Sequence, residues 1–478
     1  MTRRTKIVAT VGPASESPER LASLISAGVN VFRLNFSHGS IDQHRQVAEE
    51  IRKQASELGC YVGILADLQG PKIRIGNFRD GTVELNQGDS FALDLKLGLD
   101  EGTSRRVGLD YDSLCSQVAR DDTLLLDDGR IRLRVDSVME DSVDTTVLVG
   151  GPLGSRKGIN RLGGGLAAPA LTVKDIADIE SLAAVRPDFV AVSFVSSAQD
   201  IYQTRDLLSE QDLEPAIIAK IERAEVVADE ITLKGILTAS AGIMVARGDL
   251  GVEVGDASLI GLQKELISQA RKMDRVVITA TQMMESMINS SMPTRAEVFD
   301  VANAVLDGTD AVMLSAETAV GSYPVEVVTS MAETCLGAEQ HPSTRTSRYR
   351  IDREFSTAQE TIAMSAIYAA NHNPTVRGIA CLTESGTTPL LMSRLSSGRP
   401  IFALSNSLET LRKLTLCRGV VPLYFDSNAF GADEVDAQAI EFIKSNGYLE
   451  KGDDIILSKG VIMGSRGNTN IMKILPVP

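Results

Sequence analysis

The segments A-I-I-A-K-I-E-R-A-E (residues 216–225) and G-I-M-V-A-R-G-D-L-G-V-E (residues 242–253) both begin as short apolar strands and end in charged side chains. Successive side chains of a strand alternate between its two faces, so Lys220 and Glu222 are expected on the same face. The second strand leads into Asp249. An ammonium group and two carboxylates are therefore expected to meet where these two strands end.

Two explanations fit charged groups at these positions. An ordinary ion pair at the end of a strand would account for Lys220 and Glu222 taken alone. Two successive apolar strands that both end in charge favour chemistry, because buried charge is costly and the carboxyl ends of parallel strands line active sites in α/β folds. Two carboxylates without nearby Cys or His suit Mg²⁺ or Mn²⁺ better than zinc. We therefore predict a divalent-metal site at Glu222 and Asp249, with Lys220 facing the oxygens of an anionic ligand.

From residue 6 onward, short apolar strands alternate with amphipathic helices, which is the pattern of a parallel sheet covered by helices. The segment 258–273, for example, carries apolar residues at helical spacing. Eight such strands predict a (β/α)₈ (TIM) barrel of the α/β class. The expected strands are Lys6–Thr10, Val29–Leu34, Val62–Ala66, Asp188–Phe194, Ala216–Ile221, Gly242–Val245, Val276–Ala280 and Asp310–Leu314.

Polar side chains follow most of these strands. Solvated loop tips are the plainer explanation, but they would not explain why the strands before them are so uniformly apolar. We therefore expect the strand exits to form one functional site. Beyond the two segments above, the polar exit residues are Arg33, Asn35 and Ser37, then Asp67, then Thr281, and finally Ser315 and Glu317.

Between residues 70 and 166, short alternating strands and turn dipeptides replace the helical periodicity. We predict a small β-barrel lid domain inserted after the third barrel strand. Its second hinge is expected in the glycine-rich segment 150–165, where Arg156 and Lys157 favour a role beyond that of a flexible linker. The predicted division is a barrel over 1–69 and 167–342, a lid over 70–166, and a C-terminal unit over 343–478.

The C-terminal unit begins with a polar segment and a long helix, followed by five strands that alternate with helices. This order predicts an open doubly wound sheet. The turn T-E-S-G-T-T-P (383–389) enters a helix, so its backbone N–H groups and hydroxyls are expected to bind an effector phosphate; a well-capped helix is the plainer alternative. No G-x-G-x-x-G follows the strand, which argues against a dinucleotide. The predicted effector residues are Thr383, Ser385, Gly386, Thr387 and Thr388.

The chain has 478 residues, a net charge of −15 and a pI near 4.9. Lys and Arg form no long run, so nucleic-acid binding is not expected. The five cysteines are far apart and lack metal-ligand spacing, which is typical of reduced thiols in the cytoplasm. The N-terminal sequence lacks the apolar core of a signal peptide, and no segment approaches the length of a transmembrane helix. We expect a cytoplasmic protein without membrane contact.

Taken in order, six segments resemble the pyruvate kinase family, and the resemblance spans nearly the whole chain. Any one of them could occur by chance, whereas the set in this order is specific. The resemblance implies transfer of the phosphoryl group of phosphoenolpyruvate to ADP, giving pyruvate and ATP. The segments are R-L-N-F-S-H-G (33–39), D-L-Q-G-P-K-I-R (67–74), A-K-I-E (219–222), M-V-A-R-G-D-L-G-V-E (244–253), T-A-T-Q-M-M-E-S-M (279–287) and P-T-R-A-E-V-F-D-V-A-N-A-V-L-D-G-T-D-A-V-M-L-S-A-E-T (293–318).

The resemblance also implies a role for each matching residue, together with Mg²⁺ or Mn²⁺ in the site and a second divalent ion that arrives with ADP. These roles agree with the charges at the strand exits. The matching positions are Arg33, Lys220 and Thr281 for catalysis; the same three with Gly248 and Asp249 for the substrate; Glu222 and Asp249 for the metal; and Asn35, His38, Arg74 and Lys157 for the nucleotide.

Two positions depart from the family members that need potassium. Those members carry a glutamate where this chain has Lys72, and a threonine where it has Leu68. Asn35, Ser37 and Asp67 match the remaining ligands of the potassium ion. A lysine can place a fixed positive charge where a monovalent cation would lie. We therefore expect a bacterial, potassium-independent type.

The resemblance further implies a homotetramer with an allosteric effector in the C-terminal unit. The closing segment 460–470 lacks the tryptophan and arginine pattern of fructose 1,6-bisphosphate binders, so a sugar monophosphate or AMP is expected. Two other functions stay open. A Mg²⁺-dependent lyase acting on pyruvate enolates would have no use for Lys220, and the complete set of matching site residues argues against a non-catalytic sugar-phosphate sensor.

Overall fold

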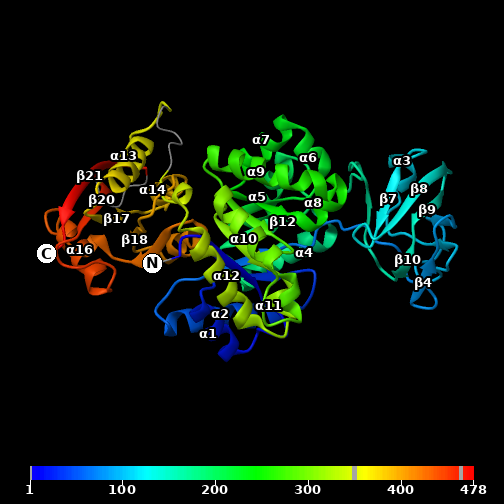
Figure 1. Ribbon diagram of the computed structural model, residues 1–478, viewed down its shortest axis with the longest axis horizontal. Helices are drawn as coiled ribbons and strands as arrows, with labels where there is room; N and C mark the ends of the chain where they lie inside the picture. Colours follow the sequence, from blue (N-terminus) through cyan, green and yellow to red (C-terminus); the bar gives the residue numbers. More distant parts are fainter. Residues whose placement is uncertain (1–2, 347–352, 462–466) are drawn as a thin grey trace.

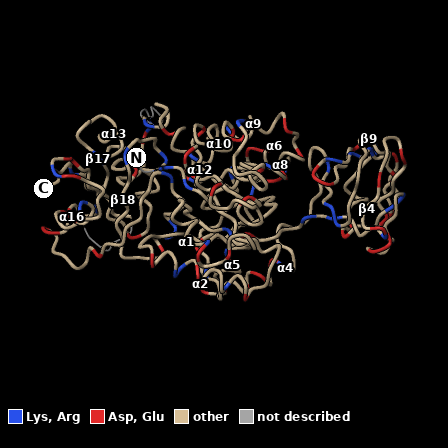
Figure 2. The backbone as a smooth tube through the Cα atoms, turned by 60° about the horizontal axis from the view of Figure 1, so that its bottom comes forward, with Lys and Arg blue, Asp and Glu red and all other residues tan. Residues whose placement is uncertain are grey.

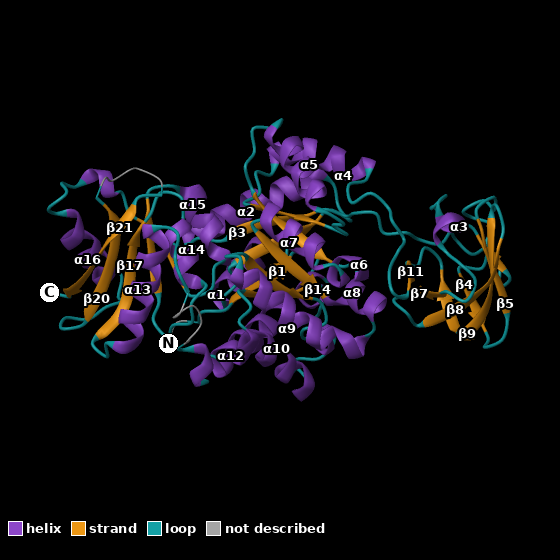
Figure 3. Ribbon diagram, turned by 90° about the horizontal axis from the view of Figure 1, so that it is seen from above, coloured by secondary structure: helices purple, strands orange, loops and turns teal. Residues whose placement is uncertain are grey.

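A computed structural model describes residues 3–346, 353–461 and 467–478. Figures 1 and 3 show three parts in a row: an α/β barrel in the middle, a β-rich part at one end and a second α/β part at the other. Some residues of the polar segment after 343 and of the closing segment 460–470 lie outside the described residues.

Eight parallel strands close the barrel in the middle of the molecule, as predicted. Their order around the barrel is β1-β16-β15-β14-β13-β12-β3-β2. Most of their residues are buried, because side chains fill the interior and helices cover the outside. Their bounds are β1 Lys6–Thr10, β2 Val31–Asn35, β3 Gly63–Asp67, β12 Phe189–Val192, β13 Ala216–Ile221, β14 Gly242–Ala246, β15 Val276–Ala280 and β16 Ala311–Leu314.

Local sequence signals set the ends of the barrel helices. Capping boxes at Ser40 and Thr294 begin α2 and α10, and Gly308 ends α10 with φ of 95°, a left-handed conformation that glycine adopts without strain. The helices are α1 Pro18–Ala27, α2 Ile41–Glu57, α4 Val173–Ser181, α5 Ala198–Ser209, α6 Ala224–Ala228, α7 Glu230–Ala239, α8 Arg247–Val254, α9 Asp256–Lys272, α10 Arg295–Asp307, α11 Ala316–Ala319 and α12 Pro324–Ala338, with 3₁₀ turns at Leu182–Ala184, Glu285–Ile288 and Pro342–Thr344.

The part inserted between β3 and α4 is all-β apart from the one-turn helix α3 (Leu114–Gln117). Its strands form a six-stranded sheet, β11-β7-β8-β9-β5-β6, and a two-stranded sheet, β10-β4, around one apolar core. The expected small barrel is thus built from two sheets. The strands are β4 Thr82–Leu85, β5 Ser90–Asp94, β6 Arg106–Val107, β7 Thr123–Leu126, β8 Ile131–Val138, β9 Ser142–Val149, β10 Gly151–Gly154 and β11 Ile159–Arg161.

The hinge expected over residues 150–165 is shorter than predicted. Much of this segment forms β10 and β11, whose backbone groups pair with β4 and β7. Three successive glycines, Gly163, Gly164 and Gly165, follow with φ of 88°, 81° and 97°. Composition alone indicated a flexible segment, but pairing with strands distant in sequence orders residues 151–154 and 159–161 as strands. The division at residues 69, 166 and 342 stays a prediction.

The C-terminal part contains a five-stranded sheet of order β19-β18-β17-β20-β21. The first four strands are parallel, and the edge strand β21 is antiparallel, so the sheet is open and doubly wound as predicted. The elements are β17 Val376–Leu382, β18 Ile401–Ser405, β19 Val420–Tyr424, β20 Asp454–Gly460, β21 Thr469–Pro476, α13 Ala358–His372, α14 Thr387–Ser393, α15 Leu408–Lys413 and α16 Val435–Ser445, with 3₁₀ turns at Leu414–Leu416 and Ser427–Ala429.

The C-terminal part packs against the amino-terminal end of the barrel. The apolar cluster inside the barrel, which includes Leu65 and Met244, continues into Ile367 of α13. Arg394 and Asp310, each 1% exposed, form an ion pair across this junction, with 2.8 Å between Nη1 of Arg394 and Oδ2 of Asp310. The carboxyl ends of the barrel strands lie at the opposite end of the barrel.

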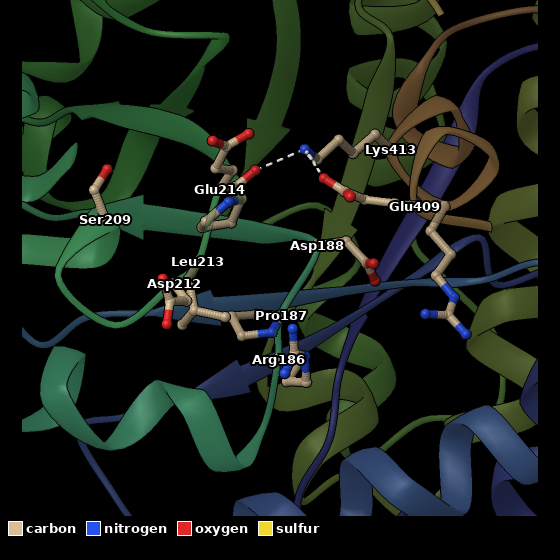
Figure 4. Close-up of a pocket in the computed structure, with 11 residues that line it drawn as sticks. Arg186, Pro187, Asp188, Ser209, Asp212, Leu213, Glu214, Glu409 and Lys413 are labelled. Carbon is tan, nitrogen blue, oxygen red and sulfur yellow. Dashed lines mark hydrogen bonds and ion pairs between the residues drawn. The ribbon is translucent and has the colours of Figure 1, made fainter. Parts of the chain in front are cut away.

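A pocket beside this junction is lined by residues that precede β12 and β13 and by α15 (Figure 4). There the ammonium of Lys413 donates to the backbone oxygen of Glu214 at 2.6 Å and pairs with Glu409 at 2.6 Å. Because Glu214 lies just before β13, helix α15 of the C-terminal part is fastened to the start of the strand that carries Lys220.

Charged residues of both signs are interspersed over all three parts (Figure 2). In the part of the chain that the structure describes, no helix combines the length and the apolar character needed to cross a bilayer.

Candidate active site

Four charged groups of alternating sign meet at the carboxyl ends of β2, β3 and β13. Asp67 pairs with Arg33 at 2.6 Å through Oδ2 and with Lys220 at 3.4 Å through Oδ1. The Lys220 ammonium also lies 3.0 Å from Oε1 of Glu222. The side chains of Asp67 and Glu222 are 1% exposed, and those of Arg33 and Lys220 are 13% and 12% exposed. The strand spacing thus places Lys220 and Glu222 together, as predicted.

The strand between β3 and β13 completes this cluster. β12 leads into Ser193 and Phe194. The Lys220 ammonium donates to Oγ of Ser193 at 2.7 Å, and the backbone N–H of Phe194 donates to Oε2 of Glu222 at 2.7 Å. Lys220 and Glu222 are therefore held by the exits of neighbouring strands, which leaves their side chains little freedom.

The charges in the cluster set each other's protonation. Burial lowers the pKa of the Lys220 ammonium, but the Asp67 and Glu222 carboxylates outweigh burial and leave that pKa above its ordinary value. Burial raises the pKa of Asp67, but Lys220 and Arg33 outweigh it and leave the pKa below its ordinary value. Lys220 is therefore cationic and Asp67 anionic at neutral pH.

Glu222 and Asp249 are the carboxylates available to a divalent metal. Burial, and to a lesser extent the charge of Asp249, raise the pKa of Glu222. Oε1 of Glu222 is buried and accepts no hydrogen bond in the described part of the chain. An ionised Glu222 is repelled by the charge of Asp249, and its Oε1 has no hydrogen-bond donor among the described residues. A divalent cation between the two carboxylates would offset the repulsion and give Oε1 a partner.

The protein supplies few metal ligands of its own. Within the described residues, no group of three or more His, Cys, Asp and Glu side chains is arranged to hold a metal. Mg²⁺ commonly binds through one or two carboxylates and completes its shell with water and substrate oxygens. Glu222 and Asp249 therefore fit a Mg²⁺ or Mn²⁺ ion whose other ligands would be water or substrate oxygens.

Lys72 contacts Asp249 of α8, one of the two predicted metal ligands. Its ammonium lies 2.9 Å from Oδ1 of Asp249 and 3.7 Å from Oδ1 of Asp128. Burial lowers the pKa of Lys72, but Asp249 outweighs it and leaves the pKa above the ordinary value. Lys72 thus places a fixed positive charge beside Asp249, while Asp67 takes its ion pairs from Arg33 and Lys220.

Gly248 and Thr281, both predicted to bind the substrate, meet between the exits of β14 and β15. The backbone N–H of Gly248 donates to Oγ1 of Thr281 at 2.8 Å. Thr281 and Gln282 both have left-handed backbones, with φ of 67° and 55°. Such conformations cost about 1–3 kcal/mol for residues other than glycine, so surrounding contacts must hold them.

Arg247 holds this left-handed turn. Its buried guanidinium donates to the backbone oxygens of Thr281 at 2.7 Å and Gln282 at 3.3 Å, and pairs with Asp300 at 2.7 Å. These contacts tie the exit of β14 to the exit of β15. The Thr281 hydroxyl is thereby fixed beside Gly248.

The predicted nucleotide residues lie in two groups. On the barrel, Asn35 is the last residue of β2 and His38 lies just after it, whereas Arg74 and Lys157 belong to the inserted part. Arg74 donates to the backbone oxygen of Arg156 at 2.9 Å, and Lys157 pairs with Asp127 at 2.7 Å. A ligand that touched both groups would bridge the barrel and the inserted part.

The predicted effector residues lie in the C-terminal part, at the turn between β17 and α14. The hydroxyl of Ser385 lies 2.9 Å from that of Thr387, and Oγ1 of Thr383 accepts from the N–H of Gly386 at 3.0 Å. Thr388 is buried and bonds to Gln359 at 2.7 Å and Thr469 at 2.8 Å. The turn is therefore remote from the barrel site and packed by its own hydrogen bonds.

Three residues of the site were not assigned a role from the sequence. Ser193 binds Lys220, Thr10 accepts from Arg33 at 3.1 Å, and Arg247 holds the turn at Thr281. Thr10 and Ser193 each lie at a strand exit, so the rule that identified the other exits could have found them. Nothing in the sequence indicated that Arg247 folds back onto backbone oxygens.

Comparison with known proteins places both α/β parts in one family. A model described as "Pyruvate kinase, barrel domain" matches residues 2–328, and one described as "Pyruvate kinase, alpha/beta domain" matches residues 360–475.

The chain belongs to the pyruvate kinase family.

Similar proteins agree with this assignment along the whole chain. The chain is 53% identical to pyruvate kinase II of Salmonella typhimurium over 475 residues, covering 99% of each chain. It is 55% identical to the pyruvate kinase of Haemophilus influenzae over 459 residues, covering 96% of each chain. A crystal structure of a pyruvate kinase from Cryptosporidium parvum superposes with a TM-score of 0.91 at 35% identity, covering 100% of this chain and 96% of that one.

The raised pKa of Glu222 predicts a pH-dependent metal affinity. A proton competes with the metal for this carboxylate below its raised pKa, so the affinity for Mn²⁺ is expected to fall as the pH is lowered, by up to about tenfold per pH unit. An ordinary glutamate would show this fall only near pH 4–5, at roughly its reference pKa of about 4.3. Water-proton relaxation of Mn²⁺ solutions between pH 5 and 8 measures the affinity.

Two variants serve as controls for this titration. Glu222→Gln removes the titrating ligand and is expected to weaken Mn²⁺ binding at every pH and to flatten its pH dependence. Glu265→Gln changes an exposed carboxyl on α9 and is expected to leave the profile unchanged. If Glu222→Gln showed the same pH profile as the unaltered chain, Glu222 would not be a metal ligand.

Proposed function

We propose that this chain catalyses the pyruvate kinase reaction, in which the phosphoryl group of phosphoenolpyruvate passes to ADP to give pyruvate and ATP. Membership of the pyruvate kinase family supports this proposal. The observation that carries the mechanism is the buried cluster of Arg33, Asp67, Lys220 and Glu222 at the exits of adjacent barrel strands.

Lys220 and Arg33 are assigned to the phosphoryl group. In phosphoryl transfer, negative charge is spread over the equatorial oxygens while donor and acceptor oxygens are held in line. Both cations pair with Asp67, which fixes them side by side. Their positive charge is therefore in place before the substrate arrives, and it stabilises the transition state without reorganisation.

Glu222 and Asp249 are assigned to the divalent metal. A bound Mg²⁺ or Mn²⁺ would polarise the carboxylate and enolate oxygens of the substrate as a Lewis acid. The two protein carboxylates and Lys72 set the charge around that position, and a second ion accompanying ADP is part of the same proposal.

Gly248, Asp249 and Thr281 are assigned to the carboxylate end of the substrate. The backbone N–H groups of Gly248 and Asp249 lie at the start of α8, where the helix dipole favours an anion, and Thr281 contributes its hydroxyl. Breaking the P–O bond of the substrate leaves an enolate, and a proton must then be added at its methylene carbon to give pyruvate. Thr281, fixed by Gly248 and Arg247, is assigned to that side of the substrate.

The inserted part, residues 70–166, is proposed to act as a lid. It lies between the two barrel segments, 1–69 and 167–342, and the C-terminal unit spans residues 343–478. Arg74 and Lys157 on the inserted part and Asn35 and His38 on the barrel are assigned to ADP. Closure of such a lid would exclude water from the transferring phosphoryl group.

A steady-state assay tests the proposed reaction. Phosphoenolpyruvate, ADP and Mg²⁺ are expected to yield pyruvate, measured by coupling to lactate dehydrogenase, and ATP in equal amounts. Lys220→Met is expected to lower kcat by roughly 10³-fold, because it removes a cation that neutralises the transferring phosphoryl group.

Lys234→Met is the matched control, since Lys234 is exposed on α7 and pairs only with Glu230 of the same helix among the ion pairs described. It is expected to keep full activity. Pyruvate release that did not depend on ADP would contradict the kinase reaction and support the enolate lyase. A chain without either activity that still bound sugar phosphates would support the sensor.

Lys72 is proposed to replace the potassium ion that other family members use. Its ion pair with Asp249 and its raised pKa support a permanent positive charge at this place. Asn35, Ser37 and Asp67 are assigned to the same region of the site.

The rate is therefore expected to be the same in tetramethylammonium chloride as in potassium chloride. Lys72→Glu is expected to lose roughly 100-fold in rate without potassium, because a negative charge replaces a positive one, and to recover when potassium is added. Lys72→Gln removes the charge without reversing it and separates loss of the cation from introduction of an anion. A strict potassium requirement of the unaltered chain would contradict the assignment.

An effector phosphate is proposed to bind at Thr383, Ser385, Gly386, Thr387 and Thr388, as a sugar monophosphate or AMP. The Oγ1 of Thr410 in α15 donates to the backbone oxygen of Glu384 at 2.8 Å, and Lys413 of the same helix is fastened to the start of β13. This contiguous route from the effector turn to the strand of Lys220 supports coupling of the two sites. A homotetramer in the cytoplasm completes the proposal.

AMP or a sugar monophosphate is expected to shift the affinity for phosphoenolpyruvate by about 5- to 150-fold. Thr387→Ala is expected to abolish that shift while leaving effector-free activity intact, as judged by KM for phosphoenolpyruvate with and without effector. Thr375→Ala, which removes an exposed hydroxyl elsewhere in the C-terminal part, is the control. If both Thr387→Ala and Thr388→Ala responded to the effector like the unaltered chain, the effector would not bind at this turn.

A further inference from the structure

Glu253 lies in the last turn of α8 and contacts two other segments, which belong to different parts of the site. Its backbone oxygen accepts from the N–H of Gly163 at 2.9 Å, and its Oε1 accepts from the side-chain amide of Asn160 at 3.3 Å. Its Oε2 accepts from the N–H of Ala224 at 2.8 Å. The side chain is buried, with the residue 7% exposed.

The first of these segments is the connection between the inserted part and the barrel. Gly163 and Asn160 lie at the end of the inserted part, where β11 gives way to the three left-handed glycines. On its other side, this connection is anchored to the inserted part through the N–H of Leu162, which donates to the backbone oxygen of Thr123 at 2.9 Å. A movement of the inserted part must therefore act on the bonds to Glu253.

The second contacted segment and α8 itself carry the proposed metal ligands. Ala224 lies two residues after Glu222, and Asp249 lies one helical turn before Glu253 on α8. Residues four apart on a helix share a face, so a displacement of Glu253 moves the same side of α8 that carries Asp249. Glu253 thus fixes the loop behind one metal carboxylate against the helix that carries the other.

The space around this junction is filled. A Cβ atom at Gly164 would lie 2.3 Å from Oε2 of Glu225 and 3.3 Å from Oε2 of Glu253. Arg223 pairs with Glu225 at 3.6 Å and donates to the backbone oxygen of Ala168 at 2.6 Å. The connection therefore has no room to shift past Glu253 without displacing it.

This arrangement opposes stability at neutral pH. Burial raises the pKa of Glu253 to about 7, with the nearby Glu225 acting in the same direction. A carboxyl whose folded pKa is raised loses stability as the pH rises from its unfolded pKa toward about 7, since ionisation is easier in the unfolded chain. A buried carboxyl that costs stability, yet joins α8 to two other segments, is expected to hold those segments in position.

We propose that Glu253 is a positioning residue that couples the inserted part to the metal site, so that nucleotide held by the inserted part sets the placement of Asp249 relative to Glu222. The proposal rests on the proposed function for the role of nucleotide. It extends that function by naming the residue through which the lid and the metal ligands communicate.

A double-mutant cycle tests the coupling. Lys157→Ala is expected to raise KM for ADP by roughly tenfold in the unaltered chain and by roughly threefold or less in Glu253→Ala, because the lid no longer acts on the metal site. Glu265→Ala, an exposed carboxyl on α9, is the control and is expected to leave the effect of Lys157→Ala at its full size. Equal effects of Lys157→Ala with and without Glu253 would overturn the proposal.

A second measurement does not depend on activity. Glu253→Ala is expected to weaken Mn²⁺ binding in the absence of nucleotide by roughly tenfold, the size typical of residues that orient metal ligands. Amide hydrogen exchange over residues 160–165 is expected to accelerate, while exchange over β15 stays unchanged. Unchanged Mn²⁺ affinity in a folded Glu253→Ala protein would also overturn the proposal.

Two further variants cover a failure of Glu253→Ala to fold. Glu253→Gln keeps one acceptor oxygen, so it is expected to show a smaller effect in the same direction. Gly164→Ala disturbs the junction from the side of the connection while Glu253 is retained, and it is expected to weaken Mn²⁺ binding as well. If the unaltered chain showed no ADP-dependent pyruvate formation, the proposed function would fail, whereas Mn²⁺ binding and hydrogen exchange would still decide the role of Glu253.

Discussion

The carboxylate of Asp67 is the group on which the barrel site depends. It is buried between two cations that would repel each other without it, and it forms ion pairs with both. Removing one partner from a buried ion pair typically costs about 3–5 kcal/mol, because the remaining charge is left uncompensated. Asp67 thereby holds Arg33 and Lys220 close together at the mouth of the barrel.

The barrel uses buried charge differently at its two ends. At the amino-terminal end, Asp310 pairs with Arg394 and also accepts from the N–H groups of Val277 at 2.9 Å and Arg418 at 3.0 Å. At the carboxyl-terminal end, Oδ1 of Asp67 and Oε1 of Glu222 make ion pairs but accept no hydrogen bond in the described part of the chain. A complete network suits a permanent interface, whereas incomplete satisfaction is typical of a place that receives a ligand.

Strain and packing concentrate around the same mouth. Thr281 and Gln282 adopt left-handed backbones that Arg247 holds, and Glu253 joins α8 to the connection of the inserted part. Each of these residues acts on a group that the proposed chemistry needs, although neither Arg247 nor Glu253 is among the assigned catalytic residues. The residues at the strand exits are therefore held in place by other charged residues, such as Arg247 and Glu253, which bind their backbone or the backbone next to them.

The sequence by itself determined the architecture and most of the site. Apolar runs bounded by capping boxes and glycines predicted the eight barrel strands, because strand and helix periodicity are local properties, and the period of two placed Lys220 beside Glu222. Only the tertiary structure decided that part of the glycine-rich segment forms β10 and β11, that Lys72 pairs with Asp249, and that Arg247 and Glu253 hold backbone groups of other segments. These contacts join residues far apart in the chain through backbone atoms or long flexible side chains, and neither leaves a periodic pattern in the sequence.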